Sequence, residues 1–330
     1  MYYCDSLNNS EFNITGNINN IFIKLCVAGI KNPPVVKLNV NPQKTFDDFF
    51  NLKNKCIEKF IFHKNNDLKN FSCIDCYRKT ERDNLINLDN NIKHININIH
   101  SSPCQCKCIY CQNVYNFNDN EETKKWYNVF FETMLYGIKK QYISKDCMWR
   151  LDAGEITIHP YKKEFFNLLK DFKTRYYTNG FIFDNDIANA LKNINNELSI
   201  SIDCGTSLSW EKIKGFNNFD NVKKHISKYI QHCINTQQIH IKYIVLPEYN
   251  NNLDDYIGII NFLKENNIKE LQIARDIHLR YTKDIKYKNS LLTSVSQLSK
   301  ICKSSNIYPD IMNKFFSKEE KDYIKIKELN

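Results

Sequence analysis

Short runs of β-branched and aromatic residues alternate with longer amphipathic stretches from about residue 92 onward, and this alternation limits the possible folds most. Repeated β/α units of this kind build a parallel sheet with right-handed crossovers. We therefore expect an α/β fold, a partial (β/α)6 TIM-like barrel. The predicted strands are HININIH (94–100), CMWRL (147–151), TRYYT (174–178), ELSISID (197–203), IHIKYIVL (239–246) and ELQIARD (270–276). The predicted helices cover 121–141, 161–172, 184–194, 219–234, 253–266 and 288–304.

The parts of the chain on either side of this pattern differ from it. Residues 1–90 contain weak strand signals, the pair Pro33-Pro34 and a predicted helix over 44–62, so we expect an N-terminal α+β extension. Residues 91–285 are predicted to form the barrel core. Residues 286–330 are charged and helix-prone, which predicts a helical C-terminal tail. The 330 residues are enough for a large core with an appendage.

Composition narrows the class of protein. No apolar run approaches the roughly 18 residues that a membrane span needs, and the start MYYCDSLNNSEF lacks the features of a signal peptide. We expect a cytoplasmic protein with no membrane span. The formal charge of +9 fits an acidic partner such as RNA, but the dispersed lysines favour a solvated basic surface. In a reducing compartment, the 13 cysteines are expected to be thiols or metal ligands rather than disulfides.

Four cysteines crowd the segment that follows the first predicted strand. They are Cys104, Cys106, Cys108 and Cys111, in SSPCQCKCIYCQ (101–112). Loops at the carboxyl ends of parallel strands are where β/α proteins place their chemistry. Thiolates are ligands of zinc and of iron–sulfur clusters. This segment is therefore a candidate metal site.

Three of these cysteines, Cys104, Cys108 and Cys111, have the spacing C-x3-C-x2-C, with Tyr110 before the last one. The spacing resembles the signature of the radical SAM superfamily, of the kind with extra upstream cysteines. The resemblance implies a [4Fe-4S] cluster whose open iron binds S-adenosylmethionine (SAM). It implies an enzyme in which the cluster reductively cleaves SAM to a 5′-deoxyadenosyl radical that abstracts hydrogen from an unidentified substrate. We expect Cys106 to point away and to be dispensable.

The same resemblance implies SAM-binding residues at later strand ends. Gly154 and Glu155 are similar to the Gly-Gly-Glu element that meets the SAM amino group, with Ala153 replacing the first glycine. Alternation along the fourth strand turns Ser201 and Asp203 to one side, where the resemblance suggests SAM ribose and carboxylate as partners. A Lys-Gly element follows in SLSWEKIKGF. The expected cofactor-binding residues are Tyr110, Gly154, Glu155, Asn179, Ser201 and Asp203.

Upstream, Cys73-x2-Cys76 is a candidate second metal site, for another iron–sulfur cluster or for zinc. Together with Cys108-x2-Cys111 it also allows a zinc-binding scaffold that binds nucleic acid. A third hypothesis is a tRNA methylthiotransferase, a class that carries extra N-terminal cysteines. The substrate stays open between a peptide, a glycan and a nucleotide. The resemblance implies a reducing protein, such as flavodoxin or ferredoxin, as a partner.

Overall fold

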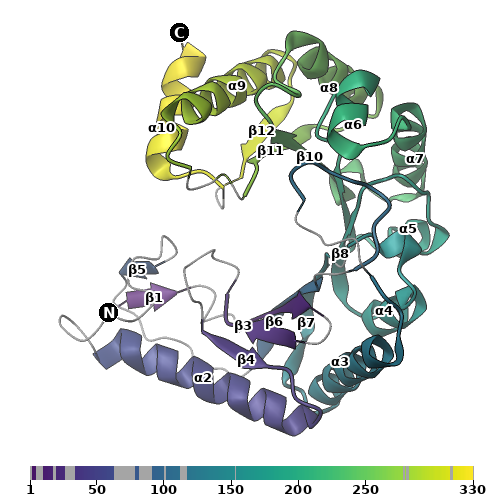
Figure 1. Ribbon diagram of the computed structural model, residues 1–330, viewed down its shortest axis with the longest axis vertical. Coiled ribbons are helices and arrows are strands. Elements are labelled where there is room, and N and C mark those ends of the chain that lie inside the picture. The colour runs from purple at the N-terminus through teal and green to yellow at the C-terminus, as the bar shows by residue number, and fades with distance from the viewer. Residues whose placement is uncertain are drawn as a thin grey trace. The chain divides into compact units, whose positions relative to one another are not determined.

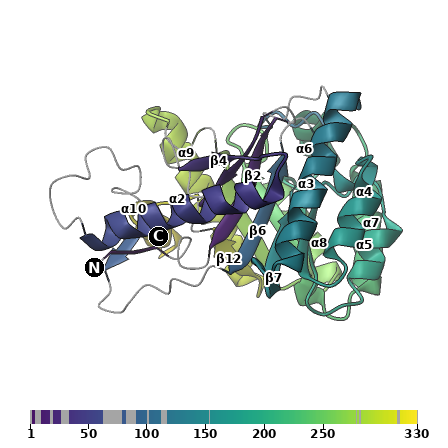
Figure 2. The same ribbon diagram turned by 90° about the horizontal axis from the view of Figure 1, so that it is seen from below.

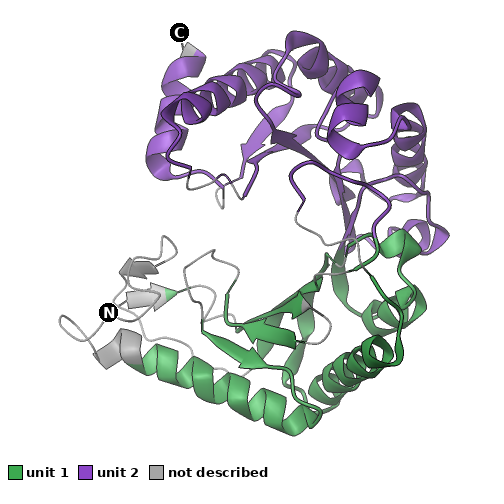
Figure 3. Ribbon diagram, viewed as in Figure 1, with its two compact units in different colours: residues 1–103, 113–175 green, residues 104–112, 176–330 purple. Residues whose placement is uncertain are grey.

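The chain forms two compact units in the computed structural model (Figures 1 and 3). Unit 1 comprises residues 1–103 and 113–175, and unit 2 comprises residues 104–112 and 176–330. The cysteine-rich segment therefore groups with unit 2. The structure describes residues 2–4, 10–17, 20–26, 34–62, 79–81, 91–99, 102–111, 117–152, 154–277, 279, 282–312 and 315–329.

The sheet of unit 1 combines strands of the N-terminal extension with the first strands of the β/α pattern. Its order is β4 (Val35–Lys37), β3 (Asn20–Lys24), β2 (Glu11–Asn17), β6 (Ile92–Ile99) and β7 (Ile143–Leu151). The pairs β4–β3 and β3–β2 are antiparallel, whereas β2–β6 and β6–β7 are parallel. A separate antiparallel pair joins β1 (Tyr2–Cys4) to β5 (Lys79–Glu81). The extension thus continues the sheet of the β/α core.

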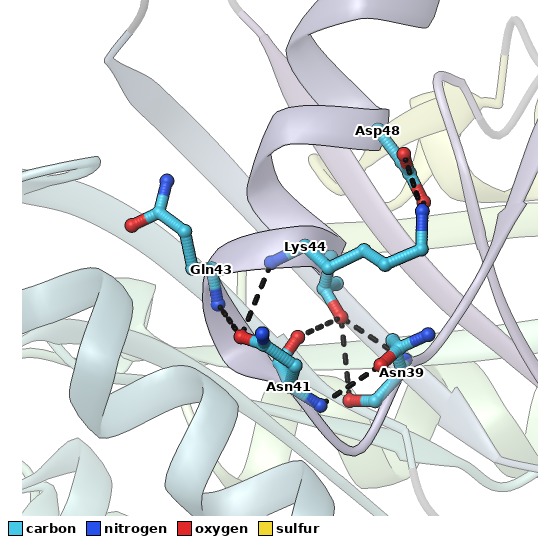
Figure 4. A network of polar contacts seen from close by, with 6 residues as sticks. Asn39, Asn41, Gln43, Lys44 and Asp48 are labelled. Carbon is cyan, nitrogen blue, oxygen red and sulfur yellow. Dashed lines mark hydrogen bonds and ion pairs between the residues drawn. The ribbon is translucent and has the colours of Figure 1, made fainter.

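Helix α2 (Pro42–Phe62) begins with a network of polar contacts, shown in Figure 4. The side-chain oxygen of Asn41 accepts the backbone N–H of Gln43 at 3.0 Å, and Pro42 occupies the first helical position. An Asn before a Pro in this arrangement is a strong helix start. Lys44 and Asp48 form an i,i+4 ion pair at 2.9 Å. Local contacts therefore favour the start of this helix at Pro42, two residues before the predicted start at residue 44.

Helix α2 and helix α3 (Glu121–Lys139) pack against the same sheet, α2 beside β4 and α3 beside β7. Figure 2 shows the two helices next to each other. The buried ring of Phe46 joins them to the sheet, with centroid distances of 5.7 Å to Phe12 and 5.2 Å to Tyr142. Such aromatic packing carries much of the burial energy of a small unit. Unit 1 also contains η2 (Ile156–Ile158) and α4 (Lys162–Leu169).

Unit 2 has a parallel sheet in the order β9 (Glu197–Ser201), β10 (Ile239–Val245), β11 (Glu270–Arg275) and β12 (Tyr308–Ile311). β8 (Lys173–Thr178) begins in unit 1 and ends in unit 2. The helices of this part are α5 (Asn185–Ala190), α6 (Ser207–Lys214), α7 (Phe219–His232), η3 (Thr236–Gln238), α8 (Leu253–Glu265), α9 (Ile285–Ser304) and α10 (Lys318–Leu329).

The α/β fold class is confirmed, and each predicted strand and helix of the β/α pattern overlaps an observed one. Helix α6, strand β12 and the short helices η2 and η3 were not predicted. Helix α6 is only eight residues long, and β12 lies in the segment expected to be a helical tail, where it pairs in parallel with β11. Ile307 and Pro309 are buried there, so a short apolar run joins the sheet between two helices. The domain limits at residues 90 and 285 stay predictions. None of the helices in the described ranges is long and apolar enough to cross a bilayer.

Candidate functional site

The cysteine loop, residues 104–111, is seated on the carboxyl end of α6. The backbone N–H of Lys107 donates to the carbonyl of Lys214 at 2.9 Å, and that of Ile109 donates to the carbonyl of Ile213 at 3.1 Å. Gly215 then leaves the helix with φ of +83°, a left-handed conformation that favours glycine. A Cβ on Gly215 would lie 3.2 Å from the Cβ of Lys107. The loop and the helix end are therefore in close contact.

The four thiols of this loop differ in exposure. Cys104 and Cys108 are half-buried, Cys106 is buried and Cys111 is exposed. A turn brings the backbone N–H of Cys111 within 3.0 Å of the carbonyl of Cys108. The buried thiol of Cys106 forms hydrogen bonds with the thiols of Cys104 and Cys108, and these contacts, with burial, raise its pKa. The expectation that Cys106 points away is wrong, because the loop folds its side chain between its neighbours.

Asn179, at the end of β8, reaches the first cysteine of the loop. Its Nδ2 donates to the sulfur of Cys104 at 3.7 Å. Its Oδ1 accepts the backbone N–H of Phe181 at 2.9 Å and the side-chain amide of Gln105 at 3.3 Å, which fixes the orientation of the amide. The Oε1 of Gln105 is buried and has no hydrogen-bond partner among the described residues. The loop therefore retains one buried acceptor that a bound group could satisfy.

Tyr110, Asp203 and Lys214 form a second set of contacts with the loop. The Nζ of Lys214 lies 2.5 Å from Oδ2 of Asp203 and 2.7 Å from the hydroxyl of Tyr110. The same hydroxyl donates to Oδ2 of Asp203 at 2.5 Å. The side chains of Asp203 and Lys214 are 0% and 1% exposed. A buried ion pair with a shared hydroxyl thus ties the residue before Cys111 to β9 and α6.

Asp203 is itself fixed from the other side. Its backbone has φ of +58°, which is uncommon outside glycine, and its Oδ1 accepts the backbone N–H of Ile244 at 2.7 Å. Its carbonyl accepts the side-chain amide of the buried Asn250 at 2.7 Å. Ser201, two residues earlier, is half-buried at the last position of β9, in register with Lys242. The carboxyl end of β9 is therefore a rigid support for the loop.

Charge inside this network alters the titration of its members. Burial lowers the pKa of Lys214, but the negative charges of Asp203 and Cys108 outweigh it, so the pKa is raised. The pKa of Cys108 is lowered to about 6, first by the hydrogen bond from Cys106 and then by the charge of Lys214, against the effect of burial. Burial and the Asp203 charge raise the pKa of Tyr110. Lysine and tyrosine therefore stay protonated while a cysteine thiolate is favoured.

Gly154 and Glu155 belong to unit 1, where they contact the two residues that precede Cys104. Gly154 has φ of +61°, and a Cβ there would lie 2.6 Å from Cβ of Ser102 and 2.7 Å from the carbonyl oxygen of Pro103. The backbone N–H of Glu155 donates to that carbonyl at 2.8 Å. Oε1 of the buried Glu155 accepts the backbone N–H of Thr157 at 3.1 Å and its hydroxyl at 2.8 Å. The carboxylate is thus oriented by its own turn.

Ser102 contacts a hydrogen-bond network of uncharged side chains. The buried His159 accepts the backbone N–H of Tyr161 on Nδ1 at 3.2 Å, so its ring proton resides on Nε2, 2.9 Å from the hydroxyl of Tyr127. The Tyr127 hydroxyl in turn contacts Ser102. Burial lowers the pKa of His159 to about 4 and raises that of Tyr127 to about 12. Both groups are therefore uncharged at neutral pH.

The loop fits an iron–sulfur cluster by its donor chemistry. No three His, Cys, Asp or Glu side chains in the described ranges converge on the position of a single ion. A [4Fe-4S] cluster does not require this, because each cysteine binds a different iron. Three thiols on one loop supply soft ligands, and Cys108 interacts with the ammonium of Lys214. Ala153, Cys73 and Cys76 lie outside the described residues.

No known family profile matches this sequence, and no curated protein matches it. Several solved structures have a backbone fold similar to that of this chain. "Native anSMEcpe with bound AdoMet" has a TM-score of 0.49 and 16% identity, over 66% of this chain and 63% of that chain. Streptococcus suis SuiB bound to S-adenosylmethionine gives 0.46 and 18%, over 70% and 54%. SuiB bound to the precursor peptide SuiA gives 0.47 and 14%, over 96% and 74%. The first two matches span less than two thirds of those chains.

Two residues at the loop were not among the predicted site residues, Lys214 and Gln105. The signal for Lys214 was the Lys-Gly element, which marks the end of α6 but not the partner of the ammonium. Gln105 lies inside the cysteine motif, at a position that the spacing leaves open. Both depend on contacts between residues far apart in the sequence.

Proposed function

We propose that the protein is a radical SAM enzyme in which Cys104, Cys108 and Cys111 hold a [4Fe-4S] cluster. The observation that carries this proposal is the meeting of separate strand ends at one loop. Asn179, after β8, bonds to Cys104, and Asp203, after β9, bonds to Tyr110. Polar residues from several strands at the carboxyl end of a sheet are typical of a β/α active site. Three cysteines leave one iron of such a cluster open, and SAM is the proposed ligand.

A bound, reduced cluster would supply the electron for cleavage of SAM to methionine and a 5′-deoxyadenosyl radical, and this radical would take hydrogen from the substrate. Around it, Asn179 donates to the Cys104 sulfur and fixes one end of the loop. Gly154 allows close approach of the backbone, and the Glu155 carboxylate is the proposed acceptor for the SAM ammonium. Ser201, half-buried at the end of β9, is the proposed partner of the ribose.

Asp203 has a different proposed task. Both of its carboxylate oxygens already bond to protein groups, Oδ1 to Ile244 and Oδ2 to Tyr110 and Lys214. We therefore propose that Asp203 and Tyr110 serve SAM indirectly, by holding the last turn of the loop. The electron is proposed to come from a flavodoxin or ferredoxin, in the cytoplasm.

Anaerobic reconstitution with iron and sulfide tests the assignment. We expect about four iron atoms per chain for one cluster, or about eight if Cys73 and Cys76 hold a second. The loaded protein should release 5′-deoxyadenosine from SAM when reduced with dithionite. Cys108→Ala should abolish iron binding and SAM cleavage, whereas Cys106→Ala is expected to retain both.

The reconstitution also separates the competing functions. A colourless protein with stoichiometric zinc and no affinity for SAM would exclude a radical enzyme and favour the zinc scaffold. SAM cleavage by Cys108→Ala would contradict the ligand assignment. Salt-dependent tRNA binding by the loaded enzyme would point to the methylthiotransferase.

A further inference from the structure

We infer that Lys214 is a positioning residue that fixes the last turn of the cysteine loop through Tyr110. The meaning of this role in the loaded enzyme rests on the proposed function, whereas the attachment of the turn concerns the chain alone. The inference assigns a role to a residue that the cysteine motif does not contain, at the end of a helix that starts after β9.

The cysteine loop is held at two places. Lys107 and Ile109 bond to the carbonyls of Lys214 and Ile213, and these backbone bonds do not depend on any side chain. They fix the middle of the loop only. The turn with Cys108 and Cys111 has a separate attachment, the hydroxyl of Tyr110, which contacts Lys214 and Asp203. Removal of the ammonium therefore weakens this attachment, because Tyr110 keeps only a carboxylate that has lost its counter-charge, while the middle of the loop stays attached.

The ammonium of Lys214 is buried together with its carboxylate partner. A lysine that is 1% exposed is rare, and it is tolerated because Asp203 lies 2.5 Å away. Without the lysine, the carboxylate would remain buried with an uncompensated charge. Asp203 is held by Ile244 and Asn250, so it cannot turn toward solvent without the loss of these bonds. The lysine is thus required by an arrangement that β9 and β10 impose.

Four variants test this role. Lys214→Met removes the charge and keeps the length of the side chain, and Lys214→Arg keeps the charge. The pair Lys214→Met with Asp203→Asn removes both buried charges, so that it folds even if the single variant does not. Lys212→Met is the matched control, because Lys212 is an exposed lysine on the same helical turn. All four are prepared as the full chain and reconstituted anaerobically.

The loaded proteins are compared by iron content. We expect Lys214→Met to lose at least half of its iron, whereas Lys214→Arg and Lys212→Met should keep most of it. In the double variant iron should return, because no uncompensated charge stays buried. An iron content of Lys214→Met equal to that of Lys212→Met would overturn the role of Lys214.

A second measurement needs no cluster. The backbone N–H of Cys111 donates to the carbonyl of Cys108 at 3.0 Å, so its amide hydrogen exchange reports opening of the turn in the iron-free chain. We expect this exchange to be at least tenfold faster in Lys214→Met than in Lys212→Met, and to slow again in Lys214→Arg. Equal exchange rates in all three would disprove the positioning role. A wild-type chain that binds no iron would disprove the proposed function, and the exchange rates would still decide the positioning role.

Discussion

Each unit buries a polar cluster, and the two clusters are built in opposite ways. Unit 1 holds an uncharged chain of contacts, Ser102 with Tyr127 and Tyr127 with His159. Unit 2 holds an ion pair, Asp203 with Lys214, bridged by Tyr110. The neutral cluster precedes Cys104 in the chain, whereas the charged one contains the residue before Cys111. The two clusters therefore bury their polar groups by different physics.

The two clusters differ in what makes the burial of their polar groups tolerable. In unit 1, burial keeps the histidine neutral, and each polar atom needs only an ordinary hydrogen bond. In unit 2, two full charges neutralise each other, so that neither can be removed alone. The first cluster should respond to acid, and the second to deletion of a partner.

Asp203→Ala should have the largest effect, because it leaves the Lys214 ammonium buried without its carboxylate. We expect a loss of about 3 to 5 kcal/mol in the free energy of unfolding, measured by urea denaturation of the iron-free chain. Asp254→Ala, which removes an exposed carboxylate from the first turn of α8, is the control and should lose less than about 1 kcal/mol. Equal losses in the two variants would contradict the description of the ion pair.

Gly154→Ala should have the second largest effect on the free energy of unfolding. The added methyl group would lie 2.6 Å from Cβ of Ser102, in a backbone conformation that alanine rarely adopts. We expect a loss of about 2 kcal/mol in unfolding free energy, together with lower iron content because Ser102 and Pro103 lead into Cys104. An alanine variant as stable as the wild type would show that this close approach is not tight.

Acid should weaken the neutral cluster. The folded pKa of His159 is about 4, below the ordinary value of 6.5, so the unfolded chain binds more protons between these values. The contribution is full above pH 6.5 and falls as the pH drops toward 4. From pH 7.5 to 5 we expect a loss of about 2 kcal/mol in unfolding free energy. His159→Gln should remove this part of the dependence, whereas His232→Gln, at an exposed position, should keep it.

Glu155→Gln should have the smallest effect on stability. The amide oxygen can still accept from Thr157, so we expect a change below about 1 kcal/mol in the unfolding free energy. Affinity of the reconstituted protein for SAM should nevertheless fall about tenfold, because a charged partner of the ammonium is lost. Equilibrium dialysis with SAM measures this, and unchanged affinity would remove Glu155 from the proposed site.

Local sequence patterns predict the elements of this fold but not the contacts between residues that are far apart in the chain. The strands, most of the helices and the position of the loop after β6 follow from local periodicity, which is short in range. Asn179 was predicted from a turn-like triplet, and its contact with Cys104 agrees with a place at the loop. Lys214 was missed because its partner Asp203 is fixed by Ile244 on a later strand. Cys106 was misjudged because the local path of the loop, not the spacing, decides where its thiol lies.

The attachment of the loop to α6 has one more consequence. The last carbonyls of a helix have no partners within it, and here Lys107 and Ile109 supply the missing donors for two of them. The cysteine loop thus completes the carboxyl end of α6, and the same two bonds fix the middle of the loop. Whatever binds the thiols also stabilises the last turn of the helix by linkage. Metal loading should be visible as slower amide hydrogen exchange at Lys107 and Ile109.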